Sequence, residues 1–109
     1  MTSPLQRSLK LLRSEGWLCA IVEKWNPHVR SRQDLFGFAD ILAVRSDDMM
    51  LVQTTSGSNV AARVAKIRGI TAAHIWIRPM RHIYVHGWSK RGPRGKRKLW
   101  ECRRVMVRI

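Results

Sequence analysis

The fold is decided by Phe38-Ala39-Asp40-Ile41-Leu42-Ala43-Val44, the polar turn Ser46-Asp47-Asp48, and the run Met49-Met50-Leu51-Val52-Gln53-Thr54-Thr55. Two apolar runs of strand length around a polar turn predict a β-hairpin over residues 38–55. If Asp47 and Asp48 are the two loop residues, Asp40 pairs with Thr55. Because side chains alternate along a strand, Asp40, Gln53 and Thr55 then share one face of the sheet.

Helices and further strands are indicated on both sides of this hairpin. Ser3-Pro4 predicts a helix start, with leucines at helical spacing up to Gly16. A second helix with an apolar stripe follows Gly57-Ser58-Asn59 and ends at Gly69. The remaining assignments are a strand over 17–25, a loop over 26–32, a short helix or strand over 70–77, and strands over 82–88 and 99–107. We therefore expect one domain over residues 1–109, an α/β fold with a mixed central sheet flanked by helices.

The charge of the chain points to a polyanionic partner. Its 21 Lys and Arg residues against 7 Asp and Glu give a formal net charge of +14. Such a surface attracts the phosphates of nucleic acid, although a basic structural protein, an anionic-membrane binder or a merely basic soluble domain would also carry it. No apolar run approaches the roughly 20 residues that a membrane span needs, so we expect no membrane association.

The cysteines and histidines do not indicate a disulfide-bonded protein or a zinc site. Two distant cysteines without a partner motif predict free thiols and a reducing, cytoplasmic location. The four histidines lack zinc spacing with either cysteine, and no phosphate-binding glycine loop or Ser-His-Asp order is present.

The strongest local binding signal is the basic loop of residues 90–98, which lies between Trp88 and Trp100. Its glycines and proline keep it open, and its cations can follow a phosphate backbone. The tryptophans are expected to pack in the core, although either could stack on an unpaired base. The nucleic-acid-binding residues that we predict are Arg30, Arg32, Arg63, Lys90, Arg91, Arg94, Lys96, Arg97 and Lys98.

Acidic residues are scarce, and Asp40 is unusual because it opens an otherwise apolar strand. Together with Gln53 and Thr55 it offers the oxygen ligands that a hard divalent cation prefers. The alternatives stay open here: Asp40 could orient a neighbouring segment, Gln53 could be a satisfied buried amide, and Thr55 is a good strand residue without any function.

The order helix, three-stranded meander, helix, strand, with Asp40 opening the second strand and Gln53-Thr54-Thr55 ending the third, resembles the PD-(D/E)XK nucleases. In size it is similar to archaeal-type Holliday-junction resolvases and VRR-NUC-type phage domains, over roughly residues 3–107. The resemblance implies a restriction-endonuclease-like core (α-β-β-β-α-β), cleavage of DNA with Mg²⁺ or Mn²⁺, a preference for branched DNA, and a homodimer.

Two positions depart from the pattern of that family, which has Glu or Asp at Gln53 and Lys at Thr55. Gln53 can still coordinate a metal through its carbonyl oxygen, whereas Thr55 cannot replace an ammonium group. The site that the resemblance implies has Asp40, Gln53 and Glu23 as metal ligands and Thr55 and Lys66 beside them. Asp34 is an alternative source of the missing carboxylate, and Arg63 an alternative source of the cation.

The leading expectation is therefore a divalent-metal-dependent DNA endonuclease, with DNA favoured over RNA. Two alternatives remain: a nuclease-fold DNA- or RNA-binding module that has lost its metal chemistry, and a basic structural or assembly protein.

Overall fold

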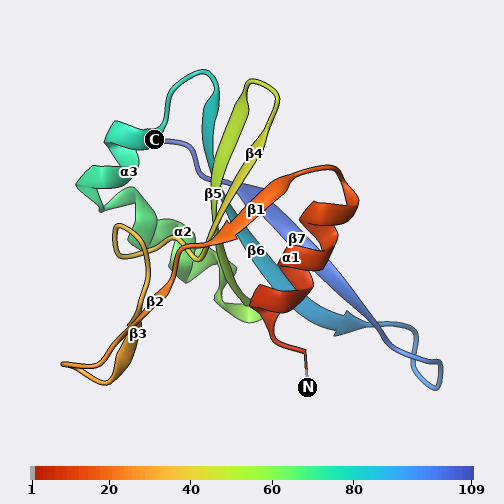
Figure 1. Ribbon diagram of the computed structural model, residues 1–109. Coiled ribbons are helices and arrows are strands. Elements are labelled where there is room, and N and C mark those ends of the chain that lie inside the picture. The colour runs from red at the N-terminus through yellow and green to blue at the C-terminus, as the bar shows by residue number, and fades with distance from the viewer. Residues whose placement is uncertain (1) are drawn as a thin grey trace.

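A mixed five-stranded sheet forms the centre of the computed structural model, which describes residues 2–109 (Figure 1). Its strand order is β1-β4-β5-β6-β7. The strands are β1 (Leu18–Ile21), β4 (Ile41–Arg45), β5 (Asp48–Ser56), β6 (Arg81–Arg91) and β7 (Leu99–Met106). All neighbours are antiparallel except β5 and β6, which are parallel. The expected α/β class with a mixed central sheet flanked by helices is confirmed.

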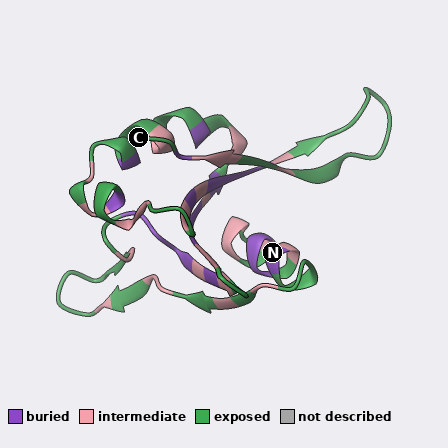
Figure 2. Cartoon of the chain, turned by 90° about the horizontal axis from the view of Figure 1, so that it is seen from above, coloured by how far each residue is buried: buried purple, intermediate pink, exposed green. Residues whose placement is uncertain are grey.

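Helices cover both faces of the sheet (Figure 2). Helix α1 (Pro4–Ser14) packs through Leu9 and Leu12 on one face. Helices α2 (Val60–Arg68) and α3 (Thr71–Trp76), with the short helix η1 (Gly57–Asn59) before them, cover the other face. The segment over 70–77, left open between helix and strand, is thus a helix. None of the helices in residues 2–109 is long and apolar enough to span a membrane.

Helix α1 follows the local signals in the sequence. The Ser3 hydroxyl accepts a hydrogen bond from the Gln6 amide at 3.2 Å, which satisfies one of the free N–H groups of the first turn. Pro4 occupies the first turn, and Gly16 leaves the helix with φ of 90°. The predicted helix is therefore correct, because every signal for it lies within the segment itself.

The central hairpin forms, but the predicted register is wrong by two residues. Arg45 pairs with Asp48, so the loop is Ser46-Asp47 and Asp40 lies level with Gln53 instead of Thr55. The Asp48 carboxylate contacts the His82 ring on the adjacent strand β6 at 3.2 Å. Because a shift of two residues preserves the alternation of side chains, Asp40 and Gln53 still belong to one side of the sheet.

The strand predicted over 17–25 and the loop predicted over 26–32 are each correct only in part, because the strand is interrupted after Ile21 and the loop is reduced to a turn over 27–30. Strand β1 ends at Ile21, and a separate ribbon follows, formed by β2 (Lys24–Asn26) and β3 (Ser31–Gln33). The amide group of Asn26 donates to Gln33 across this ribbon at 3.1 Å. Because the ribbon is exposed and polar, its sequence shows no apolar alternation that would indicate two strands.

Strands β6 and β7 continue beyond the rest of the sheet as a long two-stranded arm, seen at the lower right of Figure 1. The prediction of core packing holds for Trp88, which is 9% exposed, and is wrong for Trp100, which is 42% exposed. Trp100 lies under the Arg7 guanidinium group, 3.9 Å from its ring centroid. Cys19 and Cys102 are free thiols.

Candidate metal centre

Three carboxylates converge where β1, β4 and the β2–β3 ribbon meet. Glu23, Asp34 and Asp40 each offer one oxygen, and these oxygens lie within 4.8 Å of one another. Glu23 follows β1, Asp34 follows β3, and Asp40 directly precedes β4. Oxygen ligands from several carboxylates are the environment that Mg²⁺ and Mn²⁺ prefer.

Backbone hydrogen bonds fix the three segments relative to one another. The Val22 amide donates to the Asp40 carbonyl at 2.8 Å, which brings Glu23 beside Asp40. The Asp40 amide donates to the Val52 carbonyl at 2.9 Å. Between Asp34 and Asp40 the chain forms a tight loop, in which Gly37 adopts a φ of 83° that favours glycine. The cluster is therefore part of the framework of the sheet.

The Asp40 carboxyl group is almost enclosed, with 5% of the residue exposed. Its Oδ2 atom accepts hydrogen bonds from the Thr54 amide at 2.8 Å and from the Thr54 hydroxyl at 3.1 Å. Burial nevertheless raises the pKa of Asp40 to about 8, and the neighbouring Asp34 carboxyl adds to this rise. A divalent cation among these groups would favour the ionised form of Asp40 and offset the repulsion.

Gln53 adds an observation of a different kind. It lies level with Asp40 on the adjacent strand and is 2% exposed. Within residues 2–109 its carbonyl oxygen Oε1 is buried and has no hydrogen-bond partner. A buried acceptor without a partner destabilises a fold by about 1–3 kcal/mol. An oxygen ligand for a cation is the role that would satisfy this atom.

These groups open into a cavity of about 640 Å³ that includes the first turn of α1. The cavity is lined by Ser3, Pro4, Leu5, Gln6, Ile21, Glu23, Arg32, Asp34, Asp40, Gln53, Thr54 and Arg63. Arg32 forms a 3.1 Å ion pair with Glu23, and its side chain is 65% exposed, so the pair contributes little to stability. Arg32 and Arg63 line the same cavity as the carboxylates.

The structure brings together part of the site expected from the sequence. Glu23, Asp40 and Gln53 line the cavity. Thr55 is buried but does not line it, and Lys66 is exposed on α2 outside it. Of Lys66 and Arg63, the two side chains that the sequence suggested as the cation of the site, Arg63 lines the cavity. Thr54, which the sequence did not single out, holds the Asp40 carboxyl group, and only the correct hairpin register would have revealed it.

Comparison with protein family models, curated proteins and solved structures finds no match.

The predicted basic segments lie on two exposed ribbons. Arg30 and Arg32 belong to the β2–β3 ribbon, and the cations of residues 90–98 belong to the tip of the β6–β7 arm. Figure 1 shows the two ribbons diverging on either side of the N-terminal end of α1, where the cavity lies. Cations therefore stand on both sides of the acidic cluster.

Proposed function

We propose that this protein is a divalent-metal-dependent phosphodiesterase that cleaves DNA, with Mg²⁺ or Mn²⁺ held by Glu23, Asp34 and Asp40. The observation that carries the proposal is the buried, unpartnered Gln53 oxygen beside three converging carboxylates. Buried polar atoms are nearly always hydrogen-bonded in folded proteins, and a bound ion is one of the few explanations for an exception. The resemblance of the sequence to small PD-(D/E)XK nucleases supports the same chemistry.

The bound metal would act as a Lewis acid and lower the pKa of a coordinated water. The protein groups then have separate tasks. Thr54 fixes the orientation of the Asp40 carboxylate through two hydrogen bonds. Arg32 and Arg63, at the edge of the cavity, would bind the phosphate that is to be cut. The ribbons on either side would contact neighbouring phosphates and hold the polymer over the carboxylates.

A second function is favoured by two observations. Among residues 2–109 the lining of the cavity contains no lysine, and the uncharged Gln53 stands where the family that the sequence resembles has an acid. A module that binds nucleic acid without cutting it would keep the two basic ribbons and tolerate both changes. The ribbons alone would then carry the function.

Incubation with plasmid, single-stranded and junction DNA separates the two functions. We expect cleavage in Mg²⁺ or Mn²⁺ that is lost in Asp40→Ala and kept in Asp47→Asn, a matched control in the exposed β4–β5 turn. Cleavage that survives Asp40→Ala would contradict the assigned site. Salt-dependent binding without cleavage in either metal would favour the binding module.

A further inference from the structure

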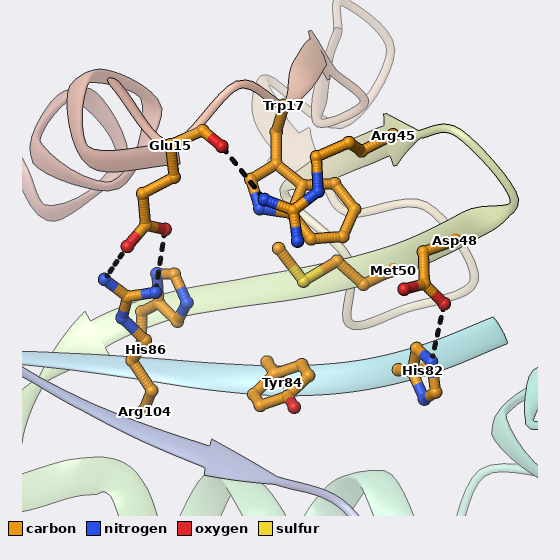
Figure 3. A pocket seen from close by; sticks show the side chains of 9 residues that line it. All are labelled: Glu15, Trp17, Arg45, Asp48, Met50, His82, Tyr84, His86 and Arg104. Carbon is orange, nitrogen blue, oxygen red and sulfur yellow. Dashed lines mark hydrogen bonds and ion pairs between the residues drawn. The ribbon is translucent and has the colours of Figure 1, made fainter. Parts of the chain in front are cut away.

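A second cavity lies on the α1 face of the sheet, beyond the C-terminal end of that helix (Figure 3). Its volume is about 520 Å³, within the range of small-molecule sites. The 11 residues of α1, about 16 Å of helix, separate it from the carboxylates at the N-terminal end. It is lined by Glu15, Trp17, Arg45, Asp48, Met50, His82, Tyr84, His86 and Arg104.

Two guanidinium groups meet at one end of this cavity. Arg104 donates two hydrogen bonds to the Glu15 carboxylate, at 2.8 and 2.7 Å. Arg45 donates to the backbone carbonyl of the same Glu15 at 2.9 Å. Two guanidinium groups therefore converge on one residue that carries a single negative charge, as Figure 3 shows. The Glu15 carboxylate balances one of these two guanidinium groups, and the other acid of the lining, Asp48, contacts His82. The guanidinium N–H groups that do not bond to Glu15 are suited to an anion with several oxygens.

Flat rings line the adjoining part of the cavity. The Arg45 guanidinium stacks on the Trp17 ring at 4.2 Å from its centroid and forms one wall. Opposite it, Tyr84 stands half-buried on β6 between His82 and His86, which face the same side of the strand. Such surfaces stack on a nucleobase of any identity, because every base has a π-face.

His86 adds a directed hydrogen-bond donor. The Trp88 indole donates to the Ser8 hydroxyl at 2.9 Å, and that hydroxyl lies 2.9 Å from His86 Nδ1. Among residues 2–109 the Ser8 hydroxyl has no other acceptor, so it donates to Nδ1 and the ring proton resides on Nε2. Burial lowers the pKa of His86 to about 4, in agreement with a neutral ring. Nε2–H is then free to donate toward a ligand.

We propose that this cavity is a nucleotide-binding site, in which Arg45 and Arg104 hold the phosphate and Tyr84 stacks on the base. The ligand chemistry, a phosphate joined to a flat heterocycle, is shared by a free nucleoside monophosphate and by one nucleotide of a bound single strand. The site does not depend on the metal centre, because no residue among 2–109 lines both cavities.

Calorimetric titration with 2′-deoxyadenosine 5′-monophosphate (dAMP) in EDTA tests this site without the metal chemistry. We expect dAMP to bind about tenfold or more tightly than deoxyadenosine or inorganic phosphate, since each of these lacks one half of the recognised group. Arg45→Gln and Tyr84→Leu should each weaken dAMP binding by about tenfold. Arg103→Gln is the matched control, because its side chain points to the opposite face of β7 and it should bind dAMP normally.

Failure of wild-type protein to bind dAMP would overturn the site, as would equal affinity in Arg45→Gln or equal affinity for phosphate alone. A concentration-dependent dimer in sedimentation that Arg45→Gln abolishes would also overturn it, since a second copy would then cover the cavity. A short oligodeoxyadenylate that displaces dAMP identifies a strand as the source of the nucleotide, and one that does not displace it identifies the free nucleotide. Because Asp40→Asn should bind dAMP as wild type does, loss of cleavage and loss of this site are measured separately.

Discussion

Gln53→Leu should stabilise the metal-free protein and weaken its metal binding at the same time. Leucine fills nearly the volume of glutamine and removes the buried oxygen that has no hydrogen-bond partner. Relief of that unpaired acceptor is expected to raise the free energy of unfolding by about 1–3 kcal/mol. Loss of the same atom as a ligand should reduce Mn²⁺ affinity by about tenfold, equivalent to roughly 1.4 kcal/mol. The two effects have opposite signs because the Gln53 oxygen that would bind the metal destabilises the metal-free protein.

Urea unfolding in EDTA measures the first effect of Gln53→Leu, and Mn²⁺ titration measures the second. Thr55→Val is a matched control on the same strand and face; it removes a buried hydroxyl that does not line the cavity. We expect this control to leave Mn²⁺ affinity unchanged. A Gln53→Leu protein that is less stable than wild type in EDTA, with unaltered Mn²⁺ affinity, would show that Gln53 is a satisfied core amide and not a metal ligand.

The other predictions concern pH and salt. Between pH 6.5 and 8, the metal-free protein should lose stability as pH rises, because folded Asp40, with a pKa of about 8, keeps a proton that the unfolded chain has released. Urea unfolding of Asp40→Asn should show no such loss of stability. In that Asp40→Asn background, stability should fall as pH drops from 6.5 to about 4, since folded His86 stays neutral while the unfolded residue becomes charged; an added His86→Asn change should flatten the profile. Replacing the three arm cations Lys96, Arg97 and Lys98 with Gln should make the affinity for duplex DNA less dependent on salt. The slope of log affinity against log salt should decrease in magnitude by about 0.9 for each phosphate that the arm no longer neutralises. An unchanged slope would show that the arm does not contact DNA.

The sequence determined those parts of the fold whose signals are local. Helix α1 was predictable because Ser3, Pro4 and the leucine spacing act within one segment. The hairpin was predictable, but not its register, because Ser46 and Asp48 both suit a turn beside Asp47. In the structure Asp48 pairs with Arg45, and its carboxylate contacts His82, which lies 34 residues away in the chain. Contacts of that range are not visible in a local pattern.

The candidate site was predictable to a similar extent. Asp40 and Gln53 share a side because alternation survives a shift of two residues. The approach of Glu23 and Asp34 depends on the β2–β3 ribbon, which no apolar periodicity indicated. Arg63 rather than Lys66 reaches the cavity because the buried stripe of α2 sets how that helix is rotated on the sheet.

The second cavity could not be predicted from the sequence. It joins Glu15 to Arg104, two residues 89 positions apart, across the end of α1. Neither residue belongs to a motif, and only the order of the strands places them together.

Mn²⁺ titration of the wild type and of Asp40→Asn at pH 7.5 is the decisive measurement for the metal centre. We predict one Mn²⁺ per chain and a proton released on binding as Asp40 ionises. Both signals should be lost in Asp40→Asn, whereas Asp47→Asn should behave as wild type. Equal Mn²⁺ binding by wild type and Asp40→Asn would contradict the assignment of Glu23, Asp34 and Asp40 as a metal centre.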